Sequence, residues 1–220
     1  MPFEYSCFIS YRRENQRNRF IIDFCQHLNT KAKDATNLGK LFLDVEEIKN
    51  GVPFPEKIYE SIINSCVFFV FNTQHYLNAT DYWCAKELYY ALKVEEKRKS
   101  LLSKDDQKLF NNILILLVNG TPNDLPNSLK TRNAYSIKEF EYFGKFLRTR
   151  RSKELLDKIG DRIDEIYKIY NKYSIEEFTN QCKGIEYPED VEIAKWISIQ
   201  KTLAQKQESD HKPILVRNAE

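Results

Sequence analysis

The chain has 220 residues, of which 42% are hydrophobic and 30% are charged, with a formal net charge of +2. These values exclude a disordered or membrane-embedded chain and are typical of a single globular domain with a helical appendage. Basic and acidic residues are mixed along the sequence, so no basic stripe predicts binding to nucleic acid. Because no segment has the character of a signal peptide or membrane span, we expect a cytoplasmic protein without membrane contact.

The first half of the chain alternates short apolar segments with amphipathic ones. The predicted strands are residues 5–10, 40–44, 66–71 and 113–118, and residues 134–136 can form a short fifth. Three helices are predicted between these strands. The first covers residues 17–30, the second begins at Pro55, and the third covers residues 82–98. Two strands, CVFFVF and ILILLV, are apolar throughout, which is typical of strands covered on both faces. The sequence therefore predicts a doubly wound, flavodoxin-like α/β sheet of about five parallel strands with flanking helices.

The second half of the chain is predicted to be helical. Residues 152–173 have apolar positions at alternating spacings of three and four, and Ser174 begins a capping box that starts another helix, ended by Gly184. A last helix over residues 188–206 is predicted to pack through Trp196, Ile199 and Leu203. The expected organisation is an α/β domain over residues 1–173, a helical extension packed on it over residues 174–206, and a polar tail over residues 207–220.

Neither the cysteines nor the histidines have the spacing of a metal site. The five cysteines include no CxxC pair, and their odd number does not favour a disulfide framework. The chain also has no Walker loop and no GxGxxG, the glycine-rich motifs that cradle phosphates. We therefore expect no metal and no bound cofactor. His75, in the loop after the third strand, is interpreted as an ordinary loop residue.

Ligands of doubly wound sheets bind beyond the carboxyl ends of the strands, where the strand order reverses. Three polar segments occupy such places in this sequence. The first strand leads into Ser10-Tyr11-Arg12-Arg13, and the second leads into Asp44 and a loop that holds Gly51 and ends at Phe54. The third leads, after a loop, into Trp83-Cys84-Ala85-Lys86-Glu87-Leu88 (WCAKEL). These three segments are the candidate ligand-binding and catalytic segments of the chain.

Trp83 and Glu87 are four residues apart, so a helix places them on one face, one turn apart. An aromatic ring beside a carboxylate suits a ribosyl substrate. The ring can stack on nicotinamide or adenine, and the carboxylate can bind ribose hydroxyls and stabilise the positive charge of an oxocarbenium-like state. Arg12 or Arg13 can meet a diphosphate. The alternative is that Trp83 is only a core anchor and Glu87 only begins an exposed helix face.

Structural alternatives exist for the other candidate residues as well. Ser10 is equally well explained as a capping residue, and Tyr11 as a packing residue. Asp44 is more simply explained as fixing its loop by accepting backbone N–H bonds than as touching substrate. The basic run RTRR at Arg148–Arg151 is interpreted as a solvated surface, because short charge runs usually are.

The motifs YSCFISYRR, Asp44 with its glycine-containing loop, and YWCAKEL resemble, in this order, three motifs of the TIR family across residues 5–172. The resemblance implies a flavodoxin-like fold and, in enzymatic members, a catalytic glutamate at Glu87. It places the substrate among seven residues. These are Ser10, Tyr11, Arg12, Arg13, Asp44, Phe54 and Trp83.

Two functions follow from this resemblance. The first is cleavage of the nicotinamide–ribosyl bond of NAD, the substrate, giving ADP-ribose or a cyclic isomer. The chain then resembles prokaryotic, Thoeris-like TIR proteins of antiviral defence, whose product signals to a separate effector. The alternative is a non-enzymatic adaptor; in either case self-association is expected through the loop at residues 44–54 and neighbouring helices. A phosphoacceptor response regulator is rejected, because such proteins need clustered acids where this chain has Ser10–Arg13.

Overall fold

The computed structural model describes residues 3–12, 18–43, 54–73, 76–77, 82–118, 125–130, 132, 134–137 and 149–210. Its strands are β1 (Tyr5–Tyr11), β2 (Leu41–Phe42), β3 (Ser65–Asn72), β4 (Ile113–Leu117) and β5 (Ala134–Ser136). Its helices are α1 (Asn18–Thr36), α3 (Phe54–Ile63), α4 (Trp83–Ser100), α5 (Lys104–Leu109), α6 (Asn127–Lys130), α8 (Arg150–Tyr170), α9 (Ile175–Cys182) and α10 (Asp190–Asp210).

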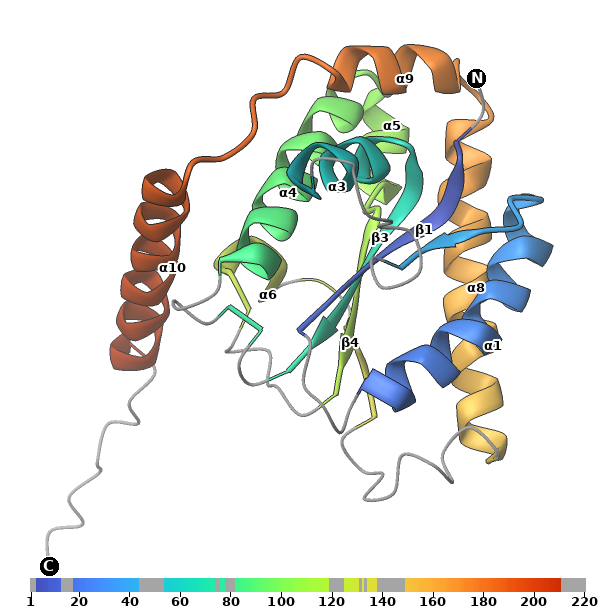
Figure 1. The fold of residues 1–220 in the computed structure, drawn as a ribbon, viewed down its shortest axis with the longest axis horizontal. Coiled ribbons are helices and arrows are strands. Elements are labelled where there is room, and N and C mark those ends of the chain that lie inside the picture. The colour runs from blue at the N-terminus through green and yellow to red at the C-terminus, as the bar shows by residue number, and fades with distance from the viewer. Residues whose placement is uncertain are drawn as a thin grey trace, which may run out of the picture.

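The five strands form one parallel sheet in the order β2-β1-β3-β4-β5. Helices α1 and α8 lie side by side on one face, and α3 and α4 cover the other (Figure 1). This confirms the predicted doubly wound fold class. The strand order reverses between β1 and β3, and ligands of such sheets bind beyond the carboxyl ends of the strands at this reversal point.

Side chains of the central strands alternate between two cores. From β1, Ile9 packs with Phe69 of β3 toward α1 and α8, whereas Phe8 packs with Phe68 toward α3 and α4. Every residue of β1, β3 and β4 is buried. Strands covered on both faces explain why the apolar runs lack the polar alternation of a half-exposed sheet.

The structure differs from the sequence-based prediction in the length of one helix and in two short helices that were not predicted. Helix α1 runs to Thr36 instead of stopping near residue 30, and it ends at Asn37, whose φ of 57° is the left-handed conformation common after helices. The short helices α5 and α6 were not predicted. The start of α5 nonetheless has a recognisable signal, because the Ser103 hydroxyl accepts a hydrogen bond from the Asp106 N–H at 3.2 Å.

Helix α10 packs on α4 through a face other than the predicted one. Ile193 and Ile197 are buried against Ala85 of α4, with Trp196 beside them. The predicted contacts Ile199 and Leu203 are instead 46% and 40% exposed, so that part of the prediction was wrong. Within the described ranges, no helix is long and apolar enough to cross a membrane.

Polar contacts fix the register of α10 along α4. Lys86 pairs with Asp190 at 2.5 Å, and Glu192 accepts hydrogen bonds from Tyr89 at 2.5 Å and from Lys93 at 3.1 Å. Helix α10 therefore lies against the amino-terminal part of α4, outside the sheet (Figure 1). The division of the chain at residues 173 and 174 stays a prediction.

Replacing Ile193 with alanine should lower the free energy of unfolding by roughly 2–5 kcal/mol, because it removes a fully buried side chain from the contact with α4. The matched control Val191→Ala, on the same helix and 81% exposed, should change it by less than about 0.5 kcal/mol. Urea denaturation followed by tryptophan fluorescence measures both. Equal effects of the two substitutions would contradict this packing.

Candidate active site

A chain of hydrogen bonds lies at the point where the strand order reverses. The Ser10 hydroxyl, at the carboxyl end of β1, donates to Glu87 Oε2 at 2.6 Å. The Tyr76 hydroxyl lies 2.6 Å from the same Ser10 oxygen. Since the Ser10 proton is directed to Glu87, Tyr76 donates to Ser10. The chain runs Tyr76 to Ser10 to Glu87, and it joins β1 to two segments more than 60 residues further along the sequence, with separations of 66 and 77 residues.

Local structure places each of these three side chains. Ser10 follows Phe8 by two positions on β1, so it points to the face covered by α3 and α4. A turn after β3, in which the Tyr76 N–H donates to the Thr73 carbonyl at 3.1 Å, brings the phenol back over the strand end. Glu87 projects from the second turn of α4 toward the sheet.

The site is buried, which strengthens its electrostatics. Glu87 is only 7% exposed and Tyr76 only 1% exposed, so Glu87 does not lie on an exposed helix face. Burial raises the pKa of the Tyr76 hydroxyl well above its ordinary value, and Cys84 and the charge of Glu87 add to the increase. Burial, followed by the charge of Glu87, likewise raises the pKa of Tyr59 on α3. Tyr76 is therefore a protonated donor at neutral pH.

Trp83 opens helix α4, one turn before Glu87, and is half-buried. The Lys86 ammonium lies 5.2 Å from the centroid of its ring, and the same ammonium pairs with Asp190 of α10. The predicted juxtaposition of an aromatic ring and a carboxylate on one helix is therefore present. The ring is held by a cation that also ties α4 to the extension.

The remaining predicted site residues differ in their placement. Tyr11 is buried in the core on the α1 and α8 side, the opposite face of the sheet from Glu87, so the structure does not bring the two together. Arg12 is half-exposed directly after β1. Arg13 and Asp44 lie outside the described residues, as does the side chain of Phe54, whose backbone begins α3.

Tyr76 was not predicted as a site residue. It belongs to no periodic pattern, and its position in the loop after β3 is shared with its neighbours. The sequence indicated only that Tyr76 follows a strand at the reversal point of the sheet. The same was true of His75, so the position did not single out Tyr76. Among the residues that the structure describes, no three His, Cys, Asp or Glu side chains come together as metal ligands.

Ser10→Ala should lower the free energy of unfolding by roughly 1.5–3 kcal/mol, because the buried Glu87 carboxylate loses a hydrogen-bond donor. A double-mutant cycle with Glu87→Ala should give a coupling energy above about 0.5 kcal/mol. Ser6→Ala is the matched control, since Ser6 is a buried serine of the same strand that donates to the Lys40 carbonyl. If both serines show the same coupling to Glu87, the hydrogen-bond chain is not a unit.

Comparison with protein families places the chain beside known domains. The TIR domain family matches residues 7–140, more than half of the chain, and this span includes Ser10, Tyr76 and Glu87. None of the curated proteins compared with the chain matches it. The order of the sheet and the family match agree with one another. The chain belongs to the TIR domain family.

Proposed function

We propose that this TIR domain cleaves the nicotinamide–ribosyl bond of NAD. The observation that carries the proposal is the Glu87 carboxylate, buried at the reversal point of the sheet, oriented by Ser10 and one helical turn from Trp83. An adaptor surface has no need of a carboxylate that is buried and hydrogen-bonded in this way. Burying a charge is costly, so its retention at the reversal point of the sheet favours a chemical role.

The role proposed for Glu87 is electrostatic. As the bond between the ribose anomeric carbon and nicotinamide breaks, positive charge develops on the ribose. A carboxylate that is already oriented in a site of low dielectric stabilises this charge better than water does, because it needs no reorganisation during the reaction. Glu87 also offers its oxygens to the ribose hydroxyls, which fixes the sugar next to the carboxylate.

The proposed step balances without a metal or a general acid. The electron pair of the C–N bond goes to the nicotinamide nitrogen, which was cationic and leaves neutral. The ribosyl cation is then captured by water, which loses a proton and gives ADP-ribose, or by a group of the same dinucleotide, which gives a cyclic isomer. Both outcomes are open in this proposal, since both share the first bond cleavage.

The other residues serve orientation. The Tyr76–Ser10 pair holds one oxygen of Glu87, so that the carboxylate does not rotate away from the sugar. Trp83 is proposed to stack on a ring of the dinucleotide, and Arg12 to meet its diphosphate. The buried Thr73 hydroxyl, directly after β3, has no hydrogen-bond partner within the described part of the chain. A polar ligand group bound at the carboxyl end of β3 would satisfy this hydroxyl.

The biological setting belongs to the same proposal and rests on the resemblance alone. The product would act as a signal in antiviral defence, received by a separate effector protein. Self-association through residues 44–54 and the neighbouring helices would bring domains together, and activity would then rise with protein concentration.

Glu87→Gln should reduce nicotinamide release from NAD by at least roughly a hundredfold, because it removes the charge while nearly keeping the shape. The matched control Glu96→Gln changes an exposed glutamate of the same helix and should leave the rate unchanged. Chromatography of the products measures release over a range of protein concentrations. Equal release by the Glu87→Gln variant would remove Glu87 from the mechanism. No release by the unmodified chain at any concentration would favour the adaptor alternative.

Tyr76→Phe should lower kcat by roughly three- to tenfold and leave KM nearly unchanged, because it weakens the orientation of Glu87 without touching the substrate. Tyr5→Phe, which changes a buried tyrosine at the amino end of β1, is the control and should leave both constants as they are. Steady-state kinetics with NAD separate the two constants. If the Tyr76→Phe variant has the same kcat as the unmodified chain, the hydrogen-bond chain has only a structural role.

A further inference from the structure

A cavity lies at the opposite end of the sheet from Glu87. Its volume is about 620 Å³, and its lining includes Asn111 and Ile113 at the amino end of β4 together with side chains from α4, α5, α6 and α8. We propose that this cavity binds a small ligand that carries a phosphate group and a planar apolar part, such as a nucleoside monophosphate. The proposal does not depend on the function proposed for Glu87.

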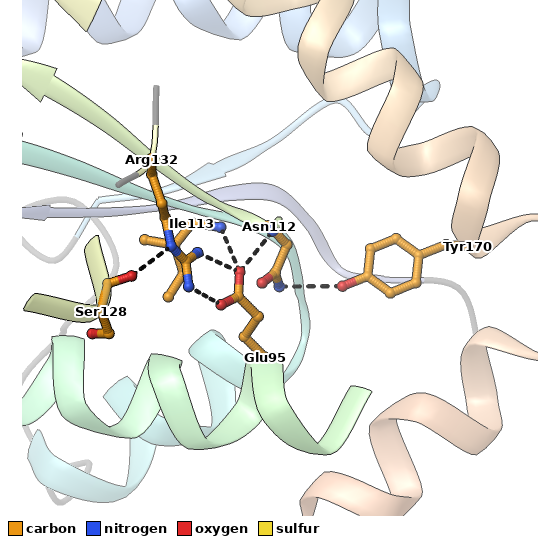
Figure 2. Close-up of polar contacts among 6 residues, drawn as sticks. All are labelled: Glu95, Asn112, Ile113, Ser128, Arg132 and Tyr170. Carbon is orange, nitrogen blue, oxygen red and sulfur yellow. Dashed lines mark hydrogen bonds and ion pairs between the residues drawn. The ribbon is translucent and has the colours of Figure 1, made fainter. Parts of the chain in front are cut away.

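One wall of the cavity is the Arg132 guanidinium, which a buried carboxylate holds in place (Figure 2). Its two terminal nitrogens donate to the two oxygens of Glu95 at 2.7 and 2.5 Å, and its Nε donates to the Ser128 carbonyl at 3.2 Å. Glu95 is anchored in turn by the backbone N–H groups of Asn112 and Ile113, at 2.9 and 3.3 Å. These contacts engage three of the five N–H groups of the guanidinium, so one N–H of each terminal nitrogen remains available to a ligand.

A second guanidinium also lines the cavity. Arg162 of α8 donates to Glu165 at 2.7 Å and to the Leu109 carbonyl at 2.7 Å. Its side chain is 24% exposed, and that of Arg132 is 15% exposed, so both are largely shielded from water. A guanidinium that is fixed and partly desolvated loses little freedom on binding an anion, and its planar fork matches phosphate geometry.

Two lysines complete the positive lining. Lys99, near the end of α4, has no ion pair within the described part of the chain. Lys108 of α5 pairs with Asp105, but both side chains are exposed, and such pairs contribute little. The lining holds Lys99, Lys108, Arg132 and Arg162 against the single carboxylate of Glu165. Even with Glu95 counted behind the wall, the cavity keeps an excess of positive charge, which favours an anion.

The rest of the lining is suited to a flat apolar group. Leu114 of β4 and the half-buried ring of Tyr135 on β5 belong to the same face of the sheet and contribute apolar lining, and Ile113 of β4 adds to it. An aromatic ring at such a place can stack on a base. The volume of the cavity falls within the usual range for small-molecule sites, which is about 300–1,000 Å³. Cations together with an aromatic ring in one lining therefore indicate a nucleoside phosphate rather than phosphate alone.

Isothermal titration of the full chain with AMP, adenosine and inorganic phosphate tests the proposal. We expect AMP to bind saturably and more tightly than either of the other two, and its affinity to fall as sodium chloride is added. Lys99→Gln and Arg162→Gln should each weaken AMP binding by about tenfold, because each removes a charged donor. Lys97→Gln is the matched control, since Lys97 lies near Lys99 on α4 but does not line the cavity.

Two further measurements make the result decisive. Circular dichroism shows whether the Arg162→Gln variant keeps its fold. If that variant unfolds, Lys99→Gln still tests the proposal, because the Lys99 side chain makes no described contact. Trp83→Ala tests whether AMP binds instead at the candidate active site. The proposal is overturned if AMP does not saturate the protein at millimolar concentrations. It is equally overturned if binding survives Lys99→Gln but is lost in Trp83→Ala. Inorganic phosphate binding as tightly as AMP would refute the nucleoside part.

Discussion

The pairing of β1 with β3 is the contact on which the rest of the structure depends. These parallel strands run side by side from Tyr5 beside Ser65 to Tyr11 beside Phe71, and every side chain on both is buried. Strands buried on both faces require helices on both sides of the sheet. The same pairing brings the end of β1 next to the end of β3, so Ser10, Tyr76 and Glu87 meet there.

The fold was predictable because its strongest signals are long and local. The fully apolar runs of β3 and β4 indicated a sheet covered on both faces, and the structure has that sheet. The short helices α5 and α6 gave too few residues for a period to appear. The packing face of α10 was mispredicted for a different reason. Its apolar residues lie on more than one side, and only contact with Ala85 of α4 selects Ile193 and Ile197 over Ile199.

The candidate site was predictable in part. The spacing of Trp83 and Glu87 depends only on helix geometry, so the sequence was enough to place them one turn apart. Tyr76 reaches Ser10 through a turn between distant segments, and no local pattern encodes such a contact. Strand alternation does say that Ser10 and Tyr11 point to opposite faces, and only Ser10 lies on the face of α4.

The central claim is that Glu87 acts on the ribose of NAD from a fixed, buried position. The most direct measurement is a crystal structure of the unmodified chain with a non-cleavable carbocyclic analogue of NAD. If Glu87 has this role, the carbocyclic ring that carries nicotinamide lies at the carboxyl ends of β1 and β3. One of its hydroxyl groups then lies within about 2.6–3.2 Å of the Glu87 carboxylate. A dinucleotide bound elsewhere, or bound there with no ribose hydroxyl in contact with Glu87, would contradict this role.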